Sequence, residues 1–254
     1  GLEFYSGILV PGFVHPNCQL ELSSLNTLLK NTEIESFIRK IKELGKEEKL
    51  TIEKAIQIAD RKMWAAGIAA CGDTSYTGLT INTKLKSKIH YHTFVPYWGL
   101  NPSYSRQAYE YARLVHADFH KNNLNAEIIL QSPDSLTEPF SLRSIQNTES
   151  ENYNFHDITN TIPGEARLTN LTRSIFIANQ VSVLDELTLI QEKFLQIKPE
   201  ELFDIACLNG AKILGIENIF GSFEKGKKPG VNLISGINFQ NFRLSERSKV
   251  KRLV

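Results

Sequence analysis

Residues 8–23 constrain the fold of this chain more than any other stretch. Residues 8–14 are apolar apart from one Pro-Gly step, a pattern that favours a strand buried on both faces. Polar residues follow at Asn17, Gln19 and Glu21. In an extended chain, a period of two places these three side chains on one side. The sequence therefore predicts a buried strand with three polar groups converging at its end.

Helical and strand-like segments alternate along the chain, which is typical of a parallel sheet. The predicted strands after the first are 67–74, 88–95, 126–131 and, more weakly, 144–149. The predicted helices lie in 25–44, from an N-cap at Thr51 to Trp64, and over 103–122, 182–196 and 199–208. A (β/α) barrel usually needs about 250 residues, and this chain has 254. Because residues 134–174 are polar and poor in strand signals, we expect an incomplete or distorted barrel.

A motif in the opening stretch resembles a known enzyme family. Pro-Gly-Phe-Val, five residues and Leu-Glu-Leu-Ser, spanning 11–23, resemble the first barrel strand of the amidohydrolase superfamily. The similarity is to its deaminase and chlorohydrolase branch, which includes proteins like aminofutalosine deaminase. This resemblance implies a TIM-like (β/α) barrel of the metal-dependent hydrolase type. It also implies hydrolysis of C–N bonds, such as deamination of a heterocyclic or nucleoside-like substrate, with zinc or iron as the family's cofactor.

The same resemblance indicates that four metal-ligand positions have changed. The family has a His-x-His pair where this chain has Asn17 and Gln19, a third histidine at Gln146 and an aspartate at Arg173. Amide oxygens are weak donors for zinc compared with a neutral imidazole, and a cation repels a metal ion. We therefore expect no bound cofactor and no catalytic residue, and interpret the chain as a pseudoenzyme or a truncated form.

The C-terminal part also resembles this family, at the point where its members leave the barrel. Residues 208–216 and the turn-rich stretch 221–234 carry the similarity. We predict a barrel domain over 1–220 and, over 221–254, strands that remain from a small β-sandwich. Because few strands precede the barrel, we expect the strand at 231–234 to have an unpaired edge, which favours association or disorder.

The composition excludes several classes of partner. Twenty-nine basic and 28 acidic residues give a net charge of +1, so nothing favours nucleic acid or an acidic membrane. The basic residues gathered in 243–252 are interpreted as a solvated tail. The three cysteines are few, odd in number and widely spaced, which favours free thiols and a cytoplasmic location. No apolar run approaches the roughly 20 residues of a membrane span.

Other polar residues give weaker indications of a site. Glu21, Asp73 and His92 are predicted to line a pocket with the vestigial metal positions. A metal site rebuilt from His15, Cys18 and His92 is an alternative without a motif behind it.

His116 and His120 have the spacing of zincin histidines on a helix, but Ala117 stands where that motif needs glutamate. An exposed pair on the outer face of the helix is favoured.

Three hypotheses for function remain open at the level of sequence. The chain is a non-catalytic binding or partner subunit, an active hydrolase with a rebuilt metal site, or a decayed chain that folds only in part. A small-molecule ligand is compatible with the first hypothesis. The sequence does not indicate the substrate, the oligomeric state or whether the chain is a fragment of a longer protein.

Overall fold

The computed structural model describes residues 5–24, 49–98, 102–131 and 182–254. The helix predicted within 25–44, the strand predicted at 144–149 and the two positions Gln146 and Arg173 lie outside the described residues.

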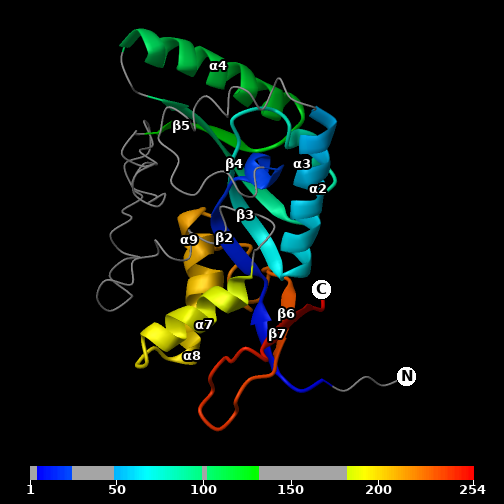
Figure 1. Cartoon of the computed structure of the whole chain (residues 1–254), viewed down its shortest axis with the longest axis vertical. Helices are drawn as coiled ribbons and strands as arrows, with labels where there is room; N and C mark the ends of the chain where they lie inside the picture. Colours follow the sequence, from blue (N-terminus) through cyan, green and yellow to red (C-terminus); the bar gives the residue numbers. More distant parts are fainter. Residues whose placement is uncertain (1–4, 25–48, 99–101, 132–181) are drawn as a thin grey trace.

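Four parallel strands form the larger sheet, in the order β2-β3-β4-β5 (Figure 1). Their bounds are Phe13–Cys18 for β2, Ile68–Thr74 for β3, His90–Trp98 for β4 and Ala126–Gln131 for β5. Each of the last three overlaps a strand expected from the sequence. Parallel neighbours need a crossover connection, and two helices provide it here: α2, Lys49–Ala65, before β3 and α4, Pro102–Lys121, before β5.

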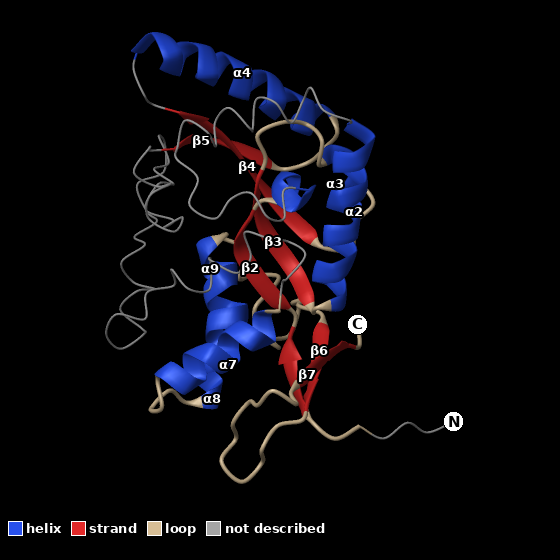
Figure 2. Ribbon diagram, in the orientation of Figure 1, coloured by secondary structure: helices blue, strands red, loops and turns tan. Residues whose placement is uncertain are grey.

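Helices cover both faces of this sheet (Figure 2). Cys71 of β3 shares a core cluster with Ile56 of α2, whereas its neighbour Ala70 packs with Ala211 of α9, Gly210–Ile213. Alternation along the strand explains the difference, because successive side chains point to opposite faces. The described strands thus form an open, doubly covered sheet and not a closed barrel.

Three antiparallel strands form a second sheet, in the order β1-β6-β7. β1 is Ile8–Pro11, β6 is Val231–Ser235 and β7 is Lys249–Arg252. Two expectations are wrong here. β6 is the central strand and is paired on both sides, so it has no free edge. The first predicted strand is in fact two strands, β1 and β2, in different sheets.

Gly12 explains the break between β1 and β2. Its amide donates to the Pro229 carbonyl at 3.1 Å, and a Cβ atom would lie 2.4 Å from that oxygen. Only a residue without a side chain allows this close approach. Since β1 precedes the parallel sheet but pairs with β6, the N-terminal strand completes the C-terminal sheet. The domain boundary at 220 stays a prediction, and a β-sandwich is not confirmed.

The helices follow the apolar spacing of the sequence, with differences at their ends. α2 begins at Lys49, so Thr51 is inside the helix and the predicted N-cap is wrong. α7, Val183–Lys193, has Ser182 as its N-cap, which accepts a hydrogen bond from the Asp185 amide at 3.1 Å. α8, Pro199–Asp204, continues through a π-helical turn, Ile205–Asn209, into α9. None of the described helices has the length and apolar character needed to cross a membrane.

The interpretation of the basic C-terminal stretch as a solvated tail is wrong for Arg243 and Arg252, which are half-buried and contact the fold, whereas Arg247, Lys249 and Lys251 are exposed. The Arg252 guanidinium lies 3.4 Å from the centroid of the Trp64 ring and donates to the Ile68 carbonyl at 3.2 Å. Arg243 donates to the Gln191 carbonyl at 2.6 Å, near the end of α7. These cations stabilise the packing of the second sheet against α2 and α7.

Candidate functional site

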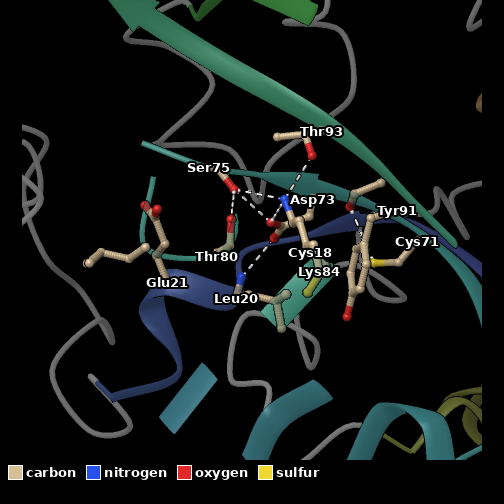
Figure 3. Close-up of polar contacts among 12 residues, drawn as sticks. Cys18, Leu20, Glu21, Cys71, Asp73, Ser75, Thr80, Lys84, Tyr91 and Thr93 are labelled. Atoms are coloured by element: carbon tan, nitrogen blue, oxygen red, sulfur yellow. Dashed lines mark hydrogen bonds and ion pairs between the residues drawn. The ribbon is translucent and has the colours of Figure 1, made fainter. Parts of the chain in front are cut away.

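A buried polar cluster lies where β3 ends, and its centre is Lys84 of the short helix α3, Ile81–Lys84 (Figure 3). The Lys84 Nζ atom lies 2.6 Å from the Asp73 Oδ2 atom, and neither side chain is exposed. Lys84 Nζ also donates to Ser75 Oγ at 3.0 Å and Thr93 Oγ1 at 2.9 Å. An ammonium group has three donors, so all three are used within the cluster.

The remaining polar atoms of this cluster are also paired. Ser75 Oγ donates to Asp73 Oδ2 at 2.8 Å and lies 3.0 Å from Thr80 Oγ1. The Lys84 ammonium lies 4.9 Å from the centroid of the Phe119 ring of α4. Because a buried charge is costly unless it is paired, the cluster holds β3, β4 and α3 together. Its chemistry is structural: it offers neither a free base nor a free nucleophile.

The chain turns into a 3₁₀ helix, η1, Leu20–Ser24, directly after β2. The Leu20 amide donates to Asp73 Oδ1 at 2.8 Å, which joins η1 to the buried polar cluster. The Glu21 carboxylate accepts hydrogen bonds from the Tyr76 amide at 2.8 Å and from the Thr77 hydroxyl at 2.7 Å. The Asp73 carboxylate therefore fastens η1 to the end of β3, and the Glu21 carboxylate fastens it to the loop that follows.

Burial dominates the electrostatics of two groups near the end of β2. Burial raises the pKa of the Glu21 carboxyl to about 7, and the charge of Asp73 adds to the rise, whereas the Thr77 hydrogen bond opposes it. Burial lowers the pKa of His15 to about 4, so its imidazole is neutral at pH 7. Both shifts disfavour the charged form, as expected for groups removed from water.

The side-chain amides of Asn17 and Gln19, the vestigial metal positions, lie at the end of β2. They do not follow the alternation of a continuous strand that would place them on one side with Glu21. β2 ends at Cys18, so Gln19 follows the strand and Glu21 lies in η1. Asn17 is half-buried and Gln19 is 2% exposed. Within the described part of the chain, neither the oxygen nor the nitrogen of the Gln19 amide has a hydrogen-bond partner.

The structure places Asp73 and His92 on opposite faces of the parallel sheet. Asp73 is in register with Thr93, whereas His92 is in register with Gly72. The His92 Nε2 atom lies 3.2 Å from the Glu127 Oε1 atom on β5. The predicted pocket is thus brought together only in part, since Glu21 and Asp73 meet through η1 and His92 lies elsewhere.

The structure also does not bring together all three residues suggested for a rebuilt metal site. The Cys18 thiol points toward α2, where its sulfur lies 3.9 Å from the Met63 sulfur. Cys18 is in register with Asp73, so it lies on the face opposite His92. All three cysteines of the chain are buried with free thiols.

The donors at this site do not fit a catalytic zinc ion, which requires imidazole, thiolate or carboxylate ligands. Both nearby carboxylates already accept hydrogen bonds, and Asp73 is paired with an ammonium group. Across 5–24, 49–98, 102–131 and 182–254, no group of three or more His, Cys, Asp and Glu side chains could hold a metal ion.

Lys84 is the residue of the buried polar cluster that the sequence does not reveal. It belongs to the polar run Thr-Lys-Leu-Lys-Ser at 83–87, which resembles a solvated face. Its partner Asp73 lies in the strand before α3, and no periodicity links the two positions. The unusual burial of a lysine becomes visible only in three dimensions.

Comparison with known proteins adds evidence on the fold. Neither a protein-family model nor a curated protein sequence matches the chain. Solved structures do match. Aminofutalosine deaminase of Helicobacter pylori, in complex with methylthio-coformycin, matches with a TM-score of 0.57 and 15% identity, over 98% of this chain and 87% of that protein.

Two further structures extend this similarity. Atrazine chlorohydrolase of Arthrobacter aurescens, complexed with zinc, matches with a TM-score of 0.61 and 12% identity, over 95% of this chain and 81% of that protein. Guanine deaminase of E. coli matches with a TM-score of 0.58 and 13% identity, over 90% of this chain and 73% of that protein. The resemblance expected from residues 11–23 is confirmed at the level of fold: this chain has the fold of these deaminases and of the chlorohydrolase.

Proposed function

We propose that this chain is a pseudoenzyme that has the deaminase fold but does not hydrolyse C–N bonds. The observation that carries this proposal is the Gln19 side-chain amide, which is buried and has no hydrogen-bond partner among the described residues, at a position where the resemblance implies a metal-binding imidazole. Asn17 makes the same change two residues earlier. In such hydrolases the metal ion lowers the pKa of a bound water to about 7 and so supplies the nucleophile. Amide donors do not support this chemistry.

The neighbouring groups support this proposal because they do not replace the missing imidazoles. Asp73 is neutralised by Lys84, and Glu21 is held by the loop after β3. His15 is buried, and its Nδ1 atom accepts a hydrogen bond from the backbone amide of Asn17 at 3.2 Å. The proposal extends to Gln146 and Arg173, which we take as the other two changed ligand positions.

Turnover and zinc affinity together test the proposal. We expect no ammonia release from purines, pyrimidines or their nucleosides in the presence of added zinc or iron(II). In a His120→Gln background, which removes the histidine pair on α4, we expect the double change Asn17→His, Gln19→His to raise zinc affinity about tenfold or more, because two imidazoles replace two amides. The matched control is Asn17→Asp, Gln19→Asn, which changes both positions without adding an imidazole. Turnover by the wild type, or no gain in affinity on adding imidazoles, contradicts the proposal.

A small polar molecule is the ligand class that the same observation favours. An unpaired buried amide costs about 1–3 kcal/mol, and a ligand that offers a donor beside an acceptor would satisfy both Gln19 atoms.

Without a ligand, Gln19→Leu should therefore stabilise the protein by about 1–3 kcal/mol in urea unfolding. Asn232→Leu is the control: Asn232 donates to the Gly67 carbonyl at 2.8 Å, so its loss should destabilise. Destabilisation by Gln19→Leu contradicts the assignment of an unpaired amide.

A further inference from the structure

The outer helix α4 carries two adjacent imidazoles that the proposed function does not use. His116 and His120 are four residues apart, which places them on the same face of the helix. Their ring centroids are 4.3 Å apart, and the rings are inclined by 49°. His120 is exposed and His116 is half-buried, so solvent and a dissolved ion reach the pair.

A hydrogen bond fixes which nitrogen of His116 holds the proton. The Nε2 atom of His116 lies 3.1 Å from the Ala126 carbonyl oxygen. Because a carbonyl oxygen can only accept, Nε2 carries the hydrogen, and in the neutral ring the lone pair is on Nδ1. Histidines that bind metals usually donate their other ring N–H to such a carbonyl or carboxylate. The Ala126 carbonyl thus gives His116 the orientation of a ligand.

The charges around the pair also favour a cation. Burial and the neighbouring His120 lower the pKa of His116, so its imidazole is neutral at pH 7. The Glu127 carboxylate is the acidic group whose charge acts on His116. A divalent ion would be held by the nitrogen lone pairs of the two imidazoles, at the Zn–N distance of about 2.0–2.1 Å.

We propose that His116 and His120 chelate a borderline divalent ion, such as zinc, on the outer face of α4, with water completing its coordination. Zinc is preferred to magnesium or calcium because those ions select oxygen ligands. This site lies on α4, away from Asn17 and Gln19, and it is independent of whether the chain hydrolyses a substrate.

Calorimetric titration of the full chain with zinc chloride tests this site. We expect binding by the wild type and a loss of affinity of about tenfold or more in His120→Gln and in His116→Gln, since each removes one of two ligands. His90→Gln is the matched control: His90 lies on β4, with its ring beside Phe220, and its affinity should be unchanged. Wild-type affinity in His120→Gln, or an equal loss in His90→Gln, overturns the proposal.

Thermal unfolding gives a second measurement that does not depend on the heat of binding. An ion that binds only the folded state raises the melting temperature. Zinc should raise it in the wild type and in His90→Gln, but not in His120→Gln. Because His120 is exposed, its replacement should leave the far-UV circular dichroism unchanged, which separates the loss of a site from the loss of the fold. An equal zinc-induced rise in all three proteins overturns the proposal.

Discussion

Lys84 has the largest structural role of any single side chain near the candidate site. It joins Asp73, Ser75 and Thr93 through contacts of 2.6, 3.0 and 2.9 Å. The sequence predicted that Asp73 lies in the strand 67–74, which β3 confirms, and the resemblance pointed to Asn17 and Gln19 as ligand positions. The sequence did not predict Lys84, because the environment of a side chain depends on contacts that local patterns do not encode. The site drawn from the resemblance stays a prediction, and the structure adds the contacts of Lys84 beside it.

Replacing Lys84 by methionine tests this role. Lys84→Met keeps the shape of the side chain but leaves the Asp73 carboxylate buried without its cation. Removing one partner of a buried ion pair costs about 3–5 kcal/mol, and we expect that loss in the free energy of unfolding, measured in urea. Arg113→Gln is the control, since the side chains of the ion pair Arg113–Glu110 are each 59% exposed. Equal small effects of the two changes would refute a structural role for Lys84.

The Glu21 carboxyl predicts a dependence of stability on pH. Its pKa is about 7 in the folded protein against an ordinary 4.5. Its contribution is therefore fully present below pH 4.5 and is lost as the pH rises through about 7. The wild type should lose up to about 3 kcal/mol relative to Glu21→Gln between pH 4.5 and 8.

His15 has the opposite effect and must be separated from Glu21. Its pKa is lowered to about 4, so it weakens the fold as the pH falls below 6.5. Since both proteins contain His15, the difference between the wild type and Glu21→Gln cancels its effect. Urea unfolding across this pH range measures that difference. For Glu110→Gln, on an exposed part of α4, the free energy of unfolding should change with pH as it does in the wild type. The same pH dependence in Glu21→Gln as in the wild type would contradict the raised pKa.

At the scale of elements, the helices and central strands were predictable, whereas their partners were not. β5 has the predicted bounds. α4 is shifted by one residue toward the N-terminus, Pro102–Lys121 against the predicted 103–122. The division of the first strand into β1 and β2 was missed because Gly12 binds the backbone at Pro229, far along the chain. Periodicity indicates which side chains are buried, but not which distant backbone they meet.

The contact between α9 and β2 gives a prediction at this scale. A Cβ atom on Gly210 would lie 2.2 Å from the Val14 carbonyl oxygen, which is backbone and cannot move aside easily. Alanine favours a helix over glycine by about 1 kcal/mol, but overpacking costs about 1–3 kcal/mol. Gly210→Ala should therefore destabilise the protein in thermal unfolding.

Gly78→Ala is the matched control for this change. Its added Cβ would meet only the end of the Ile81 side chain, at 3.2 Å, and that side chain can rotate. We expect a much smaller effect than for Gly210→Ala. A stabilised Gly210→Ala variant would show that α9 does not lie against the backbone of β2.

At the scale of the whole molecule, the similarity to solved deaminases is compatible with the proposed loss of metal-binding side chains. The sheet, its two layers of helices and the N-terminal strand that joins the C-terminal sheet are held by contacts between the chain's own residues. Buried pairs such as Asp73–Lys84 stabilise the end of β3. These contacts keep the fold, whereas under our proposal the hydrolytic chemistry is lost because Asn17 and Gln19 supply amides in place of imidazoles.

The metal content of the His120→Gln variant tests this account most directly, because that change removes the site proposed on α4. The full chain is loaded with zinc, dialysed and measured by elemental mass spectrometry. We predict far less than one zinc ion per chain, with or without a further Gln19→Ala change. One tightly held ion per chain that is lost on Gln19→Ala would contradict the account.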